Sequence, residues 1–104
     1  MAKILLCRVD EIYAGEILRV ETDGLPPVAV YNLDGAFYAT DDTCSHGQAW
    51  LSQGFIDGEI VECPFHGGCF EIKTGQPVEP PCTEAIQSYD LVVEDGAIYA
   101  LVEP

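Results

Sequence analysis

Positive charge is scarce in this sequence. Its 104 residues include four Lys and Arg against eighteen Asp and Glu, which gives a formal net charge of −14. Proteins bind nucleic-acid backbones through Lys and Arg side chains that displace counterions, and they bind anionic membrane surfaces through similar basic clusters. Four scattered cations cannot form such a basic surface. The composition therefore argues against nucleic acid and membranes as partners.

Long hydrophobic runs are also missing. The apolar run nearest the N-terminus, Ile4–Cys7, is shorter than the core of a signal peptide, and no stretch approaches the ~20 apolar residues of a membrane span. We therefore expect a cytoplasmic protein. In a reducing cytosol, its five cysteines are better explained as metal ligands or small apolar side chains than as disulfides.

Helical periodicity is absent as well, and the best helix candidate is a single turn at residues 48–51. Short runs of β-branched and aromatic residues instead alternate with Asp-Gly pairs, which are typical of hairpin turns. The pattern predicts an all-β sandwich or small barrel in one domain, residues 1–104. The expected strands are Ile4–Arg8, Glu16–Val20, Val28–Asn32, Ala36–Thr40, Ile60–Glu62, Cys69–Ile72, Asp90–Glu94 and Ala97–Leu101.

The only two histidines each follow a cysteine closely. Cys44 and His46 have one residue between them, and Cys63 and His66 have two. A random scatter of two histidines and five cysteines would rarely give this arrangement. Cys and His together bind soft or borderline metals, so zinc and an iron–sulfur cluster are the candidates. Zinc fingers usually pair like with like, whereas each pair here is mixed, but mixing does not exclude zinc.

The segments CSHG at 44–47 and CPFHG at 63–67 resemble the two cluster-binding loops of the Rieske family. The resemblance spans essentially the full chain and is nearest to the small ferredoxins of bacterial aromatic-ring-hydroxylating dioxygenases. It implies a Rieske-type antiparallel β-sandwich with two cluster-binding loops and a proline-bearing third loop at 74–83. It also implies one 2Fe-2S cluster, with one iron ligated by Cys44 and Cys63 and the other by His46 and His66.

Features that raise the potential of respiratory Rieske proteins are missing. Those proteins carry a disulfide between the two loops and hydroxyl donors from a Ser and a Tyr near the cluster. The corresponding positions here are Ala49 and Phe65 for the disulfide, and Gly68 and Phe70 for the donors. Because hydrogen bonds to the sulfurs stabilise the reduced state, their absence predicts a centre of low potential.

The count of histidines separates a carrier from an oxygenase. Oxygenase subunits of this family hold a second, mononuclear iron with two His and one carboxylate, and both histidines here are assigned to the cluster. The resemblance implies an electron carrier that takes single electrons from a flavin- and NAD(P)H-dependent reductase to a terminal dioxygenase, with both partners transient. Two other interpretations stay open, namely the small Rieske subunit of a nitrite-reductase-type enzyme and a zinc-stabilised interaction module.

The remaining cysteines need no redox role. We expect Cys7, Cys69 and Cys82 to be small apolar side chains, and Cys69 to stand at the start of a strand. Cys69 lies three residues after His66, yet four ligands already complete the cluster. The aromatic residues, Trp50 included, are expected to pack in the core or against loops.

Overall fold

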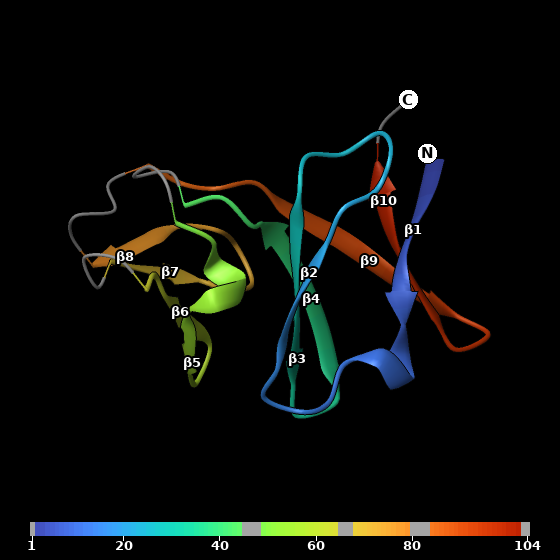
Figure 1. The fold of residues 1–104 in the computed structure, drawn as a ribbon, viewed down its shortest axis with the longest axis horizontal. Coiled ribbons are helices and arrows are strands. Elements are labelled where there is room, and N and C mark those ends of the chain that lie inside the picture. Colours follow the sequence, from blue (N-terminus) through green and yellow to red (C-terminus); the bar gives the residue numbers. More distant parts are fainter. Residues whose placement is uncertain (1, 45–48, 65–67, 80–83, 103–104) are drawn as a thin grey trace.

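Two antiparallel β-sheets make up the part of the chain that the structure describes (Figure 1). The structure is a computed structural model, and it describes residues 2–44, 49–64, 68–79 and 84–102. The larger sheet has six strands in the order β1-β10-β9-β4-β3-β2, and the smaller has four in the order β5-β6-β7-β8. The predicted all-β architecture is confirmed.

Most strands lie where the hydrophobic pattern predicts them. The larger sheet contains β1 (Ala2–Arg8), β2 (Ile17–Val20), β3 (Val28–Leu33), β4 (Ala36–Asp41), β9 (Ser88–Glu94) and β10 (Ala97–Val102). The smaller sheet contains β5 (Phe55–Asp57), β6 (Ile60–Glu62), β7 (Cys69–Glu71) and β8 (Pro77–Glu79).

Two of the predicted Asp-Gly turns have the backbone geometry that joins adjacent strands tightly. Asp34 and Gly35 have φ of 56° and 95°, and Asp95 and Gly96 have φ of 51° and 77°. Positive φ at both central residues is the signature of the type I′ turn, whose twist matches that of the flanking strands. The hairpins β3-β4 and β9-β10 therefore form as the sequence predicts.

Strands β5 and β8 were not predicted. Each has three residues, as the predicted strands β6 and β7 also have, and β8 begins at a proline inside the stretch 74–83 that was expected to be a loop. Proline is tolerated here because β8 is an edge strand and Pro77 is its first residue. The loop prediction is therefore wrong for residues 77–79.

The helical segments of the described chain are two single 3₁₀ turns, η1 (Val9–Glu11) and η2 (Leu51–Gln53). The turn expected at 48–51 is displaced, because Trp50 is extended and caps η2, while residue 48 lies outside the described residues. Neither turn approaches the length or apolar character needed to cross a membrane.

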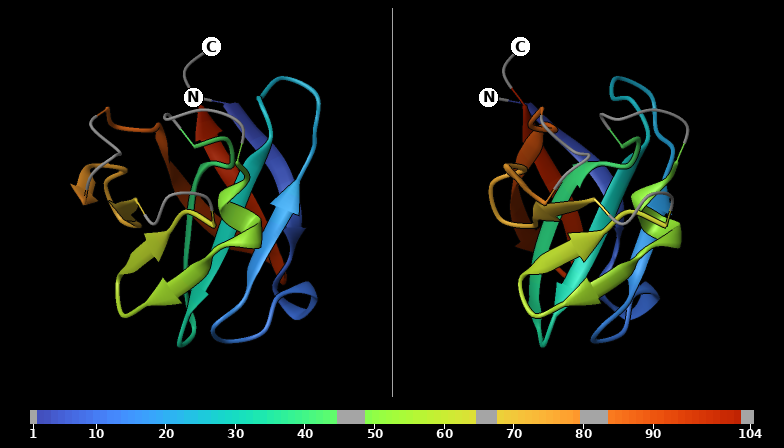
Figure 2. Two further views of the ribbon diagram at one scale, coloured as in Figure 1. Left: turned by 60° about the vertical axis from the view of Figure 1, so that its left-hand side comes forward. Right: turned by 90° about the vertical axis from the view of Figure 1, so that its left-hand side faces the viewer.

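Strand β3 joins two hydrophobic cores. Its even-numbered residues Val28 and Val30 belong to a core enclosed by the larger sheet, and its odd-numbered residues Ala29 and Tyr31 belong to a second core. All four are 0% exposed. The second core also contains residues of the smaller sheet, so this sheet packs against one face of β3 (Figure 2). We call it the inter-sheet core; its buried members are Ala29, Tyr31, Cys44, Ala49, Leu51, Val61, Cys63, Phe70, Ile72 and Ile86.

The turn after β7 offers a test of the fold. Gly75 has φ of +80°, and a Cβ at this position would lie 2.1 Å from the carbonyl oxygen of Ile86, whereas a Cβ at Gly35, with φ of +95°, would meet no atom. We expect Gly75→Ala to lower the free energy of unfolding by about 3 kcal/mol or more, through backbone collision as well as strain. Gly35→Ala is the control and should cost only about 1–2 kcal/mol. Equal losses in denaturant titrations of the two holoproteins would contradict this packing.

Candidate metal centre

Cys44 stands at the base of a short loop that leaves the larger sheet after β4. The backbone N–H of Cys44 donates to the carbonyl oxygen of Ala49 at 3.0 Å, and Thr43 forms an antiparallel bridge with Trp50. These contacts bring the two ends of the segment 44–49 together, and we call this segment the first ligand loop. His46 lies outside the described residues.

Cys63 occupies the equivalent place in the smaller sheet, directly after β6. Its backbone N–H donates to the carbonyl oxygen of Gly68 at 2.7 Å, which closes the second loop just before β7. His66 and Phe65 follow Cys63 in the sequence and lie outside the described residues.

The fold brings the two cysteines to one apolar environment. Cys44 and Cys63 are each 2% exposed, and both belong to the inter-sheet core. Nineteen positions separate them in the sequence, and they reach this core from different sheets. The pair fits a shared metal centre, since cysteine binds metals as a thiolate and a bound metal would compensate the two negative charges in these apolar surroundings.

The positions that correspond to the missing disulfide and hydroxyl donors carry apolar or no side chains where the structure describes them. Ala49 and Phe70 are buried at 5% and 0% exposure in the inter-sheet core, and Gly68 contributes its carbonyl oxygen to the bond with Cys63. Phe70 therefore acts as a packing residue between the sheets.

Among the described residues, Cys7 and Cys69 lie outside the inter-sheet core. Cys7, on β1, is buried in the core enclosed by the larger sheet, where burial and then the nearby negative charge of Glu11 raise the pKa of its thiol to about 11. Cys69 begins β7, as predicted, and is partly exposed. Cys82 lies outside the described residues.

Trp50 departs from the expectation that it packs in the core or against loops. Its side chain is 43% exposed, and the guanidinium of Arg19 on β2 lies 3.7 Å from the ring centroid. Arg19 itself was not singled out from the sequence, because the pairing of β2 with a residue thirty-one positions later depends on tertiary structure. The contact is a cation–π interaction at the end of the first ligand loop.

Comparison with known proteins identifies the family. A model of the Rieske [2Fe-2S] domain matches residues 2–90. The chain belongs to the Rieske [2Fe-2S] family. The cofactor of that family is a 2Fe-2S cluster, which favours the iron–sulfur interpretation over zinc.

The most similar relatives include ferredoxins of aromatic dioxygenase systems. Ferredoxin CarAc of Metapseudomonas resinovorans is 44% identical over 98 residues, covering 94% of this chain and 92% of that protein. The solved ferredoxin of Sphingomonas yanoikuyae B1 has a TM-score of 0.92 and 43% identity, covering 99% of this chain and 100% of the other. The predicted class, a ferredoxin that carries electrons within such systems, is confirmed.

A third similarity concerns an assembly. The complex of reduced oxygenase and oxidised ferredoxin in carbazole 1,9a-dioxygenase contains a chain that matches with a TM-score of 0.88 and 43% identity, over 94% of this chain and 91% of that one. A ferredoxin of this type therefore binds an oxygenase directly.

The Cys7 thiol gives a prediction that separates structural from reactive cysteines. With its pKa raised from 9.0 to about 11, Cys7 has about a hundredfold less thiolate at pH 8 than an ordinary cysteine. We expect iodoacetamide to alkylate Cys7 at least about a hundredfold more slowly in the folded protein than in urea, as measured by peptide mass spectrometry. Rates within tenfold of each other would contradict the assignment.

Proposed function

We propose that this chain is a Rieske ferredoxin of the cytoplasm that accepts single electrons from a flavin- and NAD(P)H-dependent reductase and delivers them to a terminal aromatic-ring-hydroxylating dioxygenase. One observation carries the proposal: Cys44 and Cys63 are both buried in the inter-sheet core, and each is followed closely in the sequence by a histidine. The similarity to dioxygenase ferredoxins supports the choice of partners.

The proposed ligands are Cys44 and Cys63 on one iron and His46 and His66 on the other. When bound, the cluster supplies a one-electron redox couple. Two ferric ions and two sulfides together carry a charge of +2. Two thiolate ligands bring the total charge of the oxidised centre to zero, whereas four thiolates would bring it to −2. A less negative centre accepts an electron more readily, so mixed ligation raises the potential above that of plant-type ferredoxins.

In this function the protein fixes the positions of the ligand cysteines and shields them from water. Both cysteines are almost fully buried, and both loops are closed by backbone hydrogen bonds next to the ligand. Cysteines fixed in this way would keep their positions when the charge of a bound cluster changes. Small reorganisation favours rapid electron transfer, which suits a carrier.

The surface charge suits brief encounters with partners. The four basic side chains of the chain all contact acidic ones: Lys3 pairs with Glu94, Arg8 with Asp10, Arg19 with Glu21 and Asp42, and Lys73 with Glu59. With a net charge of −14, most acidic residues must remain uncompensated. Such a field steers a partner with a basic docking surface and gives association that weakens as salt rises.

Substitution of the cysteines tests the ligand set. We expect Cys63→Ser to retain less than about a tenth of the cluster, because a serine oxygen is a poor replacement for a soft thiolate. Cys69→Ser is the matched control six residues away, and it should retain the full visible absorption and labile sulfide. Loss of the cluster in Cys69→Ser with retention in Cys63→Ser would contradict the assignment.

Reconstitution tests the function itself. NADH-driven oxidation of an aromatic substrate by a matched reductase and oxygenase should require this protein, and its rate should fall several-fold between 50 and 300 mM salt, since steering is screened. Activity indifferent to omission of the protein would refute the proposal. Isolation in a stable complex with a large reductase subunit would instead support the nitrite-reductase-type interpretation.

A further inference from the structure

Asp42 is a fully buried acidic residue beside the first ligand loop. It follows β4 directly and precedes Cys44 by two positions, and its side chain is 0% exposed. Taking a carboxylate out of water is costly unless hydrogen-bond donors or an opposite charge replace the lost hydration. The groups that donate hydrogen bonds to Asp42 therefore show which parts of the chain the buried carboxylate holds together.

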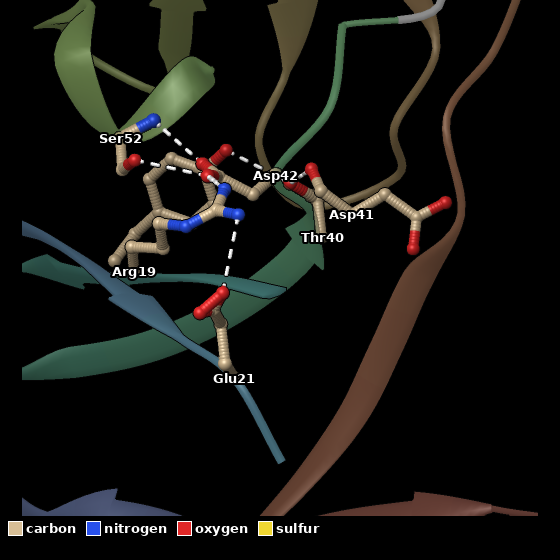
Figure 3. Close-up of polar contacts among 7 residues, drawn as sticks. Arg19, Glu21, Thr40, Asp41, Asp42 and Ser52 are labelled. Atoms are coloured by element: carbon tan, nitrogen blue, oxygen red, sulfur yellow. Dashed lines mark hydrogen bonds and ion pairs between the residues drawn. The ribbon is translucent and has the colours of Figure 1, made fainter. Parts of the chain in front are cut away.

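The Asp42 side chain accepts three hydrogen bonds (Figure 3). Its Oδ1 accepts the backbone N–H of Ser52 at 2.7 Å, and its Oδ2 accepts the Ser52 hydroxyl at 3.0 Å and an N–H of the Arg19 guanidinium. Ser52 lies in η2, on the far side of the first ligand loop, and Arg19 lies on β2. One carboxylate thus joins the exit of the loop to the larger sheet.

The backbone of Asp42 reinforces the same connection. Its carbonyl oxygen accepts the N–H of Leu51 at 2.7 Å, and its N–H donates to the carbonyl oxygen of Pro27 at 2.9 Å. Residues 43–50, which include the proposed ligands Cys44 and His46, are therefore bracketed by Asp42 on one side and by Leu51 and Ser52 on the other.

Arg19 is itself held from several directions. Its Nη2 lies 3.6 Å from Oε1 of Glu21, Trp50 covers the guanidinium at 3.7 Å, and the Arg19 side chain is only 22% exposed. Because the Trp50 ring and the surrounding chain keep water from the Arg19–Asp42 pair, this pair is screened less than an exposed one.

We propose that Arg19, Asp42 and Ser52 form a clamp that positions the first ligand loop and sets the electrostatic environment of the cluster. This inference rests on the proposed function, in that Cys44 and His46 are taken as ligands. The three side chains are positioning residues, since none is itself proposed to bind iron. The clamp ties Asp42 and Ser52, which stand on either side of the first ligand loop in the sequence, to each other and to Arg19 on β2.

The charges of the clamp predict shifts of the midpoint potential in opposite directions in two variants, which a general loss of stability would not produce. Asp42→Asn removes a negative charge near the first ligand loop, which should stabilise the more negative, reduced centre and raise the midpoint potential. Arg19→Met removes a positive charge and should lower it. At a fixed potential the ratio of reduced to oxidised protein should change by about twofold or more in each variant, in opposite directions. Ser52→Ala changes no charge and should leave the potential in place.

Cluster retention provides the second measurement. In the presence of an iron chelator, we expect the cluster of Arg19→Met to be released about tenfold faster than in the wild type, because the buried carboxylate of Asp42 loses its ionic partner. The effect should be smaller for Asp42→Asn, and about two- to threefold for Ser52→Ala, which loses one hydrogen bond. The double variant Arg19→Met/Asp42→Asn should release the cluster more slowly than Arg19→Met alone, since neither charge is then left unpaired.

Lys73→Met is the matched control. It also removes one positive charge, but from an exposed pair with Glu59 whose side chains are 44% and 62% exposed. It should change neither the potential nor the release rate. Potentials that shift in the same direction in Asp42→Asn and Arg19→Met, or not at all, would overturn the clamp. Wild-type protein that binds no 2Fe-2S cluster would instead refute the proposed function.

Discussion

Everything in this structure that bears on function depends on the burial of two cysteines in a single core shared by two sheets. Cys44 arrives from the larger sheet and Cys63 from the smaller one, and β3 supports both sheets because it is buried on both faces. The loops that carry the histidines start from these fixed points. The strands of the described chain matter to electron transfer chiefly because they hold Cys44 and Cys63 in one apolar environment.

The distribution of charge divides the molecule into an acidic exterior and a nearly neutral interior. Outside, net negative charge of −14 favours brief, salt-sensitive encounters. Inside, Asp42 is the only buried acidic side chain among the described residues, and Arg19 balances it. A centre that gains one negative charge on reduction is sensitive to nearby fixed charges in low dielectric. Because Arg19 and Asp42 carry opposite charges, their effects on the midpoint potential of the cluster partly cancel. The side chains of Ala49 and Phe70 also add little to this potential, since neither carries a hydrogen-bond donor.

Much of the fold could be predicted from the sequence, because the hairpins depend on local rules. The Asp34-Gly35 and Asp95-Gly96 turns and the alternating runs beside them needed no tertiary information. Strand β8 was missed because it begins at a proline in a stretch that looked like a loop, and Trp50 was misjudged because its contact with Arg19 joins distant segments. For the site, the coincidence of the two Cys-His pairs was sufficient to propose a metal centre, and the resemblance of the two loops to those of the Rieske family pointed to a 2Fe-2S cluster. The Arg19–Asp42–Ser52 clamp could not be predicted, since acidic, basic and hydroxyl residues are usually solvated and only burial reveals their role.

The midpoint potential of the purified holoprotein is the most direct test of the central claim, which is a cluster with mixed Cys and His ligation set in apolar surroundings for low-potential electron delivery. A spectroscopically monitored redox titration should give a one-electron transition near the lower end of the Rieske range, at about −150 mV. A value above zero would mean that donors to the sulfurs or a different environment raise the potential. A value near −400 mV, typical of plant-type ferredoxins, would contradict histidine ligation.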